Sequence, residues 1–227
     1  MDGGSHPEER QVTVFPGNDP KSPLVVLNTY TYEGSNVNNL VRGMTDRDFT
    51  MISIHVPDWN TDMTPWPSDA PCAGDERFAG EADYYIQTLT NWTIPDVEKR
   101  LSLSPSSRII SGYSLAGLFG VYCMYRTHVF DTLVSASGSM WYPGAIEYFK
   151  DNYPIQNPRY AYLSIGTRES RTRNKMLCTN EENTVALKEL LESRGAEVQF
   201  DMNPGGHLDR VNERMAKGIV WAIENSS

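Results

Sequence analysis

The sequence contains few cysteines, few histidines and no long apolar run. Its three cysteines, Cys72, Cys123 and Cys178, lie far apart and form no C-x-x-C pair. This spacing indicates neither a disulfide framework nor a zinc site, so three free thiols are expected. The four histidines include no pair at H-x-x-x-H spacing, and no metal site is predicted.

Basic residues are also scarce. Twenty lysines and arginines stand against 29 aspartates and glutamates, which gives a formal net charge of −9. Nucleic-acid-binding domains carry a basic surface, so this class is not expected. The longest apolar stretches, around 24–27 and 109–124, are shorter or more interrupted than the roughly 20 apolar residues of a membrane span. The first ten residues lack the apolar core of a secretory signal, and a cytoplasmic protein is expected.

The composition is typical of a soluble globular protein, with 39% apolar and 22% charged residues. Residues 1–10 are polar and are predicted to be disordered, whereas residues 11–227 are predicted to form one domain. Within this domain, short apolar runs alternate with helical patterns, which favours a mainly parallel sheet with helices on both faces. The first strand is an edge strand and is the one expected to be antiparallel. The predicted strands are 11–15, 24–30, 49–56, 108–113, 132–137, 159–166 and 197–202; the main predicted helices are 36–44, 80–103 with a kink near Pro95, 115–126, 144–151, 181–194 and 208–224.

The segment Gly112-Tyr113-Ser114-Leu115-Ala116-Gly117 lies between a predicted strand and a predicted helix. This context is the one that a nucleophile elbow requires, because small residues on either side allow a strained turn to expose the serine. The Leu115 N–H at the start of the helix would then face a developing oxyanion. A strand-helix turn with an incidental serine is the alternative interpretation. Ala116 departs from the G-x-S-x-G pattern, but it is the smallest replacement.

A second segment, Pro204-Gly205-Gly206-His207, follows the last predicted strand. Two glycines allow positive φ angles, so the loop can fold back and bring the imidazole toward Ser114. A histidine that caps the last helix is the alternative. The chain order, serine first and histidine last, favours the catalytic interpretation.

An acid is then expected between the serine and the histidine in the chain. Glu169 comes directly after the predicted strand 159–166, where a carboxylate can meet the imidazole, and it is the first choice. Asp209 and Asp201 are alternatives, because the first is close to His207 in sequence and the second lies near the end of the preceding strand.

These segments resemble a known family. GYSLAGLF at 112–119, YLSIGTRE at 162–169 and NPGGH at 203–207 are similar to esterases of the α/β-hydrolase fold, the group that includes esterase D and enterochelin-esterase-like enzymes. The resemblance covers most of the chain from about 24 to 224. It implies an α/β-hydrolase fold without a large lid domain, with Ser114 as nucleophile, His207 as base and Glu169 as acid.

Further residues are expected around this site. The backbone N–H of Tyr30, in the loop after the strand 24–30, is the expected second oxyanion donor. Trp59 and Trp66 lie in a proline-rich loop, and with Tyr113 they are candidates for the substrate pocket. Aromatic residues that pin this loop to the core are the alternative. Several cations lie beside the acid and are expected to form a solvated face, with binding of an anionic substrate group as the alternative: Arg168, Arg171, Arg173 and Lys175.

The sequence thus predicts a serine esterase that acts on a small-molecule ester through an acyl-enzyme, without a metal or organic cofactor. A thioesterase, a peptidase or an acyltransferase would use the same residues. A non-catalytic binding protein with the same fold is a further alternative. Neither nucleic acid nor a membrane is an expected partner, and no pattern in the sequence predicts the oligomeric state.

Overall fold

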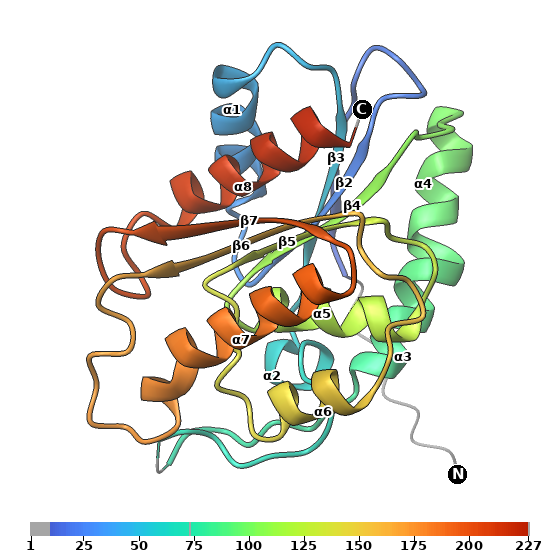
Figure 1. Cartoon of the computed structure of the whole chain (residues 1–227). Coiled ribbons are helices and arrows are strands. Elements are labelled where there is room, and N and C mark those ends of the chain that lie inside the picture. The colour runs from blue at the N-terminus through green and yellow to red at the C-terminus, as the bar shows by residue number, and fades with distance from the viewer. Residues whose placement is uncertain (1–9, 73, 227) are drawn as a thin grey trace, which may run out of the picture.

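The computed structural model describes residues 10–72 and 74–226, which form a sheet of seven strands covered by helices on both faces (Figure 1). The strand order is β1-β3-β2-β4-β5-β6-β7. β1 pairs antiparallel with β3, and all other neighbouring strands are parallel. The strands are β1 Val12–Phe15, β2 Leu24–Thr29, β3 Thr50–His55, β4 Arg108–Tyr113, β5 Thr132–Ala136, β6 Tyr160–Gly166 and β7 Glu197–Asn203.

The predicted α/β fold with its mainly parallel sheet is confirmed, and β1 is the antiparallel edge strand. The helices are α1 Gly34–Met44, α2 Trp59–Asp62, α3 Ala82–Thr88, the π-helical turn η1 Leu89–Thr93, α4 Ile94–Leu101, α5 Leu115–Arg126, α6 Ala145–Asp151, the 3-10 turn η2 Leu177–Thr179, α7 Asn180–Ser193 and α8 Val211–Asn225. The part of the chain that the structure describes contains no inserted lid domain.

Two hydrophobic cores lie on opposite faces of the sheet. α1 and α8 cover one face, while α3, α4, α5, α6 and α7 cover the other (Figure 1). The strand β2 is buried along its whole length, as expected of a strand with helices on both sides. α5 is buried at every residue except its last, Arg126. This explains why its sequence is apolar all round rather than on one stripe.

The predicted long helix 80–103 is divided into α3, η1 and α4. Pro95 is the second residue of α4, but α3, η1 and α4 follow one another without a break, so its missing N–H leaves a helical carbonyl without its usual donor. The wider π-helical turn η1 lies directly before α4. The break predicted near Pro95 is therefore this π-helical turn within a continuous helical segment.

The N-terminal segment that was predicted to be disordered lies outside the described residues, apart from Arg10. The Arg10 guanidinium donates two hydrogen bonds to Asp62, at 2.7 and 3.1 Å, and lies over the ring of Tyr85. Arg10 is therefore fixed against the domain, contrary to the predicted limit of the disordered segment. None of the helices in the described ranges has the length and apolar character that are needed to cross a membrane.

Close packing between α8 and the sheet depends on Gly218. A Cβ at this position would lie 2.6 Å from the Tyr162 ring and 2.7 Å from a methyl group of Val134. Gly43 in α1 is also helical, but a Cβ there would meet no atom within 4 Å. The same substitution should therefore have opposite effects at the two positions.

We expect Gly218→Ala to lower the free energy of unfolding by about 1–2 kcal/mol, because the methyl group overpacks the core. Gly43→Ala should raise it by up to about 1 kcal/mol, because alanine has the higher helix propensity. Urea unfolding of both variants measures these changes. Equal effects of the two substitutions would contradict the packing described here.

Candidate active site

Ser114 lies at the sharp turn between β4 and α5. Its backbone has φ 58° and ψ −122°, a conformation that non-glycine residues rarely adopt. The surrounding chain is packed too closely for larger side chains. A Cβ on Gly112 would lie 2.5 Å from Ala116, and a Cβ on Gly117 would lie 2.8 Å from the Cα of Gly138. The small residues of the predicted elbow are thus required by close contacts, and Ala116 is fully buried within them.

His207 lies in the loop between β7 and α8. Gly205 has φ 117°, and a Cβ there would lie 2.6 Å from the carboxylate of Asp209. That carboxylate accepts hydrogen bonds from the Gly206 N–H at 2.7 Å and from Arg168 at 2.9 Å. The Tyr113 hydroxyl donates to the His207 carbonyl oxygen at 2.7 Å. These contacts hold the loop so that the imidazole faces the elbow.

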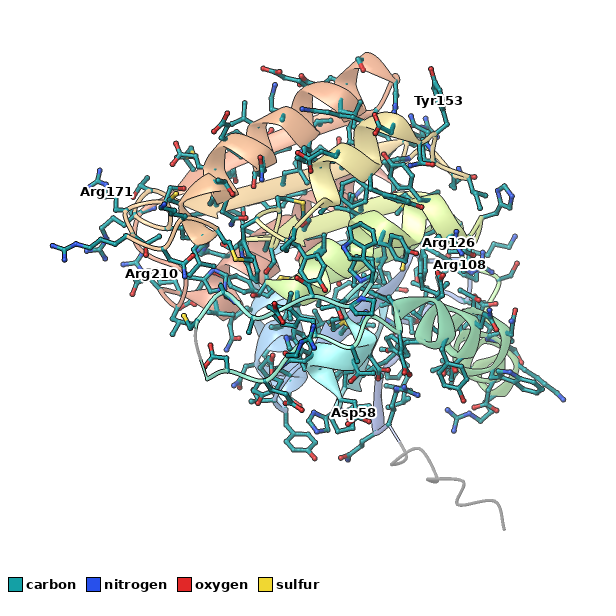
Figure 2. The ribbon with its side chains drawn as sticks, turned by 90° about the horizontal axis from the view of Figure 1, so that it is seen from below. Asp58, Arg108, Arg126, Tyr153, Arg171 and Arg210 are labelled. Atoms are coloured by element: carbon teal, nitrogen blue, oxygen red, sulfur yellow. The ribbon has the colours of Figure 1, made fainter. Side chains whose placement is uncertain are left out.

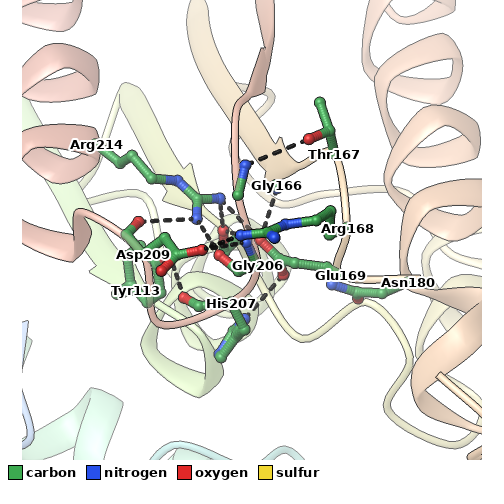
Figure 3. Close-up of polar contacts among 12 residues, drawn as sticks. Tyr113, Gly166, Thr167, Arg168, Glu169, Asn180, Gly206, His207, Asp209 and Arg214 are labelled. Atoms are coloured by element: carbon green, nitrogen blue, oxygen red, sulfur yellow. Dashed lines mark hydrogen bonds and ion pairs between the residues drawn. The ribbon is translucent and has the colours of Figure 1, made fainter. Parts of the chain in front are cut away.

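The structure brings Ser114, His207 and Glu169 into one hydrogen-bonded chain. His207 Nε2 is 3.0 Å from Ser114 Oγ. His207 Nδ1 is 2.8 Å from Glu169 Oε2 (Figure 3). An ionised carboxylate only accepts hydrogen bonds, so Nδ1 of the neutral imidazole carries the proton. Nε2 is then free to accept the hydroxyl proton of Ser114, which is the arrangement that general-base activation needs.

The Glu169 carboxylate is buried, with 4% of its side chain exposed. Its second oxygen, Oε1, accepts hydrogen bonds from the Gly166 N–H at 2.6 Å, the Ser137 hydroxyl at 2.7 Å and Arg214 at 2.8 Å. Burial alone would raise the pKa of Glu169, but the hydrogen bonds from His207, Arg214 and Ser137 outweigh it and lower the pKa to about 2. The group is therefore a carboxylate at neutral pH.

The two alternative acids lie elsewhere. Asp209 points back into its own loop, where it binds Gly206 and Arg168. The Asp201 carboxylate accepts a hydrogen bond from Tyr162 at 2.7 Å and forms an ion pair with Lys217 at 2.6 Å. Of the three carboxylates, Glu169 is the one in contact with the imidazole.

Arg214 and Ser137 are part of this arrangement, although the sequence reasoning did not select them. Arg214 is 3% exposed, and its Nη2 donates hydrogen bonds to Glu169 and Ser137. Its Nη1 donates to the Gly206 carbonyl oxygen at 3.1 Å. A signal was present in the sequence, because Arg214 shares the apolar face of the last helix with Met215. A charged residue at a buried helical position requires an oppositely charged partner.

The predicted oxyanion donors, Leu115 and Tyr30, lie near Ser114. Leu115 is the first residue of α5, so its N–H has no acceptor within the helix. Tyr30 follows β2, the neighbour of β4 in the sheet, and lines the same cavity as Ser114 and His207. Both residues are therefore next to the site.

Two cavities open beside Ser114 and His207. The larger one, of about 370 Å³, contains the predicted Trp59 and Tyr113 together with Tyr30 and Leu208. The smaller one, of about 230 Å³, is also lined by Glu169, which was predicted as the acid. Three further lining residues were not predicted from the sequence: Trp141, Leu177 and Asn180.

The expectation for Trp66 is not met. Its ring packs against Tyr122, Tyr142 and Tyr148, and its indole N–H donates to the Pro143 carbonyl oxygen at 2.9 Å. Trp66 lines neither cavity and instead pins the proline-rich loop to the core.

The charged residues near the site extend outward. Arg168 pairs with Asp209 at the surface, and both side chains are more than half exposed. Arg171 and Arg210 project from one side of the molecule (Figure 2). Within residues 10–72 and 74–226, no group of three or more histidine, cysteine, aspartate and glutamate side chains is placed to hold a metal ion.

No family model matches the chain. The uncharacterized protein YbbA of Bacillus subtilis (strain 168) is 26% identical over 151 residues. This match covers 65% of the chain and 60% of that protein, so the matched part spans less than two thirds of the curated relative.

Similar solved structures include several hydrolases. Siderophore hydrolase EstA from Aspergillus nidulans superposes with a TM-score of 0.78 at 19% identity, covering 96% of this chain and 91% of that one. An IroE-like serine hydrolase from Shewanella oneidensis gives 0.72 at 13% identity, covering 94% and 74%. The enterobactin esterase FES from Shigella flexneri gives 0.69 at 18% identity, covering 95% and 55%. At these identities the likeness shows the fold, which is the α/β-hydrolase fold expected from the sequence.

The lowered pKa of Glu169 links stability to pH. Both the folded and the unfolded chain carry this carboxylate ionised well above pH 4.5, where its contribution to stability is fully present. As the pH falls from about 4.5 toward 2, the unfolded chain binds a proton first, and a contribution on the order of 3 kcal/mol is lost.

Urea unfolding of wild type and Glu169→Gln at pH values from 7 to 3 measures this contribution. The wild type should be the more stable at pH 7, and the difference should narrow below pH 4.5. A difference that stays constant down to pH 3 would contradict the ionised, hydrogen-bonded state of Glu169.

Proposed function

We propose that the protein is a serine hydrolase that cleaves carboxylic esters, with Ser114 as nucleophile, His207 as general base and Glu169 as the acid that orients the imidazole. The observation that carries this proposal is the continuous hydrogen-bond chain from Ser114 Oγ through His207 to Glu169. The strained backbone of Ser114 supports it, because strain of this kind persists where the surrounding structure enforces it and is concentrated at functional sites.

The reaction proceeds in two halves. Ser114 Oγ attacks the ester carbonyl carbon while its proton passes to His207 Nε2, and a tetrahedral intermediate forms. The carbon–oxygen bond to the alcohol then breaks, and the alcohol leaves with the proton from Nε2. Water repeats the sequence on the acyl-enzyme, which releases the acid and restores Ser114.

Charge develops at two places in this mechanism. The imidazolium that forms on His207 is stabilised by the ionised, buried carboxylate of Glu169. The negative charge on the carbonyl oxygen is stabilised by the backbone N–H groups of Leu115 and Tyr30. The position of Leu115 at the start of α5 supports its role, because the helix N-terminus favours negative charge.

A small-molecule ester is the proposed substrate. The similar structures that are named as a siderophore hydrolase and an enterobactin esterase support this class. The two cavities beside Ser114 support it as well, because they give separate space to the acyl group and to the alcohol. Neither nucleic acid nor a metal takes part in the proposed reaction.

Ser114→Ala should abolish labelling by a fluorophosphonate probe and should lower kcat for 4-nitrophenyl acetate by about 10⁴-fold or more. Ser111→Ala is a matched control, since Ser111 lies on the same strand and its hydroxyl donates to the Val26 carbonyl oxygen. The control should remain labelled and active. Turnover by purified Ser114→Ala at the wild-type rate would reject the nucleophile.

Glu169→Gln should lower kcat by orders of magnitude, because an amide no longer holds the imidazole in the productive tautomer or stabilises its cation. Asp209→Asn should have a much smaller effect, because Asp209 binds the loop backbone and Arg168 rather than the ring. Steady-state kinetics at a temperature where both variants are folded separates the two. The reverse order of effects would reassign the acid without affecting Ser114 or His207.

A further inference from the structure

Asn180 presents an unused hydrogen-bond donor to the smaller cavity beside Ser114. Asn180 is the first residue of α7 and is 3% exposed. Its side-chain oxygen accepts a hydrogen bond from the Trp141 N–H at 3.0 Å. A backbone N–H can only donate, so this contact fixes which end of the amide is oxygen. The amide nitrogen is therefore the end of the side chain that does not bond the Trp141 N–H.

This nitrogen has no acceptor within hydrogen-bonding distance in the part of the chain that the structure describes. Asn180 also lines the cavity that contains Ser114 and His207. Figure 3 shows its side chain extending from the start of α7 toward Glu169. A donor that has no protein partner and belongs to a residue lining a ligand cavity is available to an acceptor on the ligand.

The walls of the cavity restrict the ligand group. Trp141 and Leu177 make the cavity mostly apolar, and Asn180 is the polar residue that lines it besides Ser114, Glu169 and His207. Its volume is about 230 Å³. An engineered apolar cavity of about 150 Å³ in another protein holds benzene, so a group of roughly six to eight heavy atoms fits here.

We infer that Asn180 is a specificity residue that selects a substrate whose acyl or alcohol part carries a hydrogen-bond-accepting oxygen, such as a ketone, on a short apolar chain. This inference rests on the proposed ester hydrolysis. The helix that carries Asn180 and its contact with Trp141 hold the amide in place, so recognition requires little reorganisation.

Two pairs of near-isosteric esters test the inference. For the acyl part, 4-nitrophenyl 4-oxopentanoate is compared with 4-nitrophenyl 4-methylpentanoate. For the alcohol part, 4-oxopentyl butanoate is compared with 4-methylpentyl butanoate. The readout is the ratio of kcat/KM within each pair. Effects that are common to both esters, such as a general loss of stability or of base strength, cancel in this ratio.

Asn180→Asp retains an acceptor for the Trp141 N–H but removes the donor, and Asn180→Leu removes both at similar volume. In one of the two pairs, each variant should lower the kcat/KM of the ketone ester relative to that of its methyl analogue by roughly 3- to 10-fold. The matched control is Asn183→Leu. Asn183 lies one turn further along α7, donates to the Met140 carbonyl oxygen and does not line the cavity. Its ratios should stay within about twofold of the wild type.

The outcomes separate the two proposals. A change of ratio in the acyl pair assigns the smaller cavity to the acyl group, and a change in the alcohol pair assigns it to the leaving group; either result supports the inference. Wild-type ratios retained by both Asn180 variants in both pairs, with hydrolysis intact, overturn the role of Asn180 alone. A wild-type enzyme that hydrolyses none of the four esters and is not labelled by the fluorophosphonate probe overturns the proposed function, and the role of Asn180 with it.

Discussion

The buried carboxylate of Glu169 is the point on which the arrangement of this site depends. It receives hydrogen bonds from β6 through Gly166, from the segment after β5 through Ser137, from α8 through Arg214 and from the loop after β7 through His207. Segments that lie far apart in the sequence are thus joined at one group. A carboxylate can be buried in this way because a cation and several donors replace its hydration.

Much of the fold follows from local patterns in the sequence. The alternation of short apolar runs with helical patterns predicted the strands and the main helices along the chain, because central strands with helices on both faces are continuous apolar runs. The elbow around Ser114 was also readable, since a sharp turn between a strand and a helix is what requires several small residues in succession. The position of Glu169 followed from topology, because the carboxyl ends of neighbouring parallel strands meet at one edge of the sheet.

Other features depend on contacts that no local pattern contains. Arg214 and Asn180 take their places through partners far away in the sequence, Glu169 in one case and Trp141 in the other. For Trp66, the sequence pattern fits two different roles. An aromatic residue in a proline-rich loop fits a pocket wall and a core anchor equally well, and its tertiary contacts with Tyr142 and Tyr148 decide for the anchor.

The backbone of Ser114 has a consequence for how this chain can change. A serine at φ 58° costs on the order of 1 kcal/mol or more relative to glycine, which adopts positive φ without a Cβ clash. Selection for a more stable protein would therefore favour glycine at this position, and that substitution would remove the serine hydroxyl. In the proposed mechanism Ser114 is the nucleophile, so stability and catalysis are opposed at this one residue, and selection for stability alone would tend to produce an inactive protein.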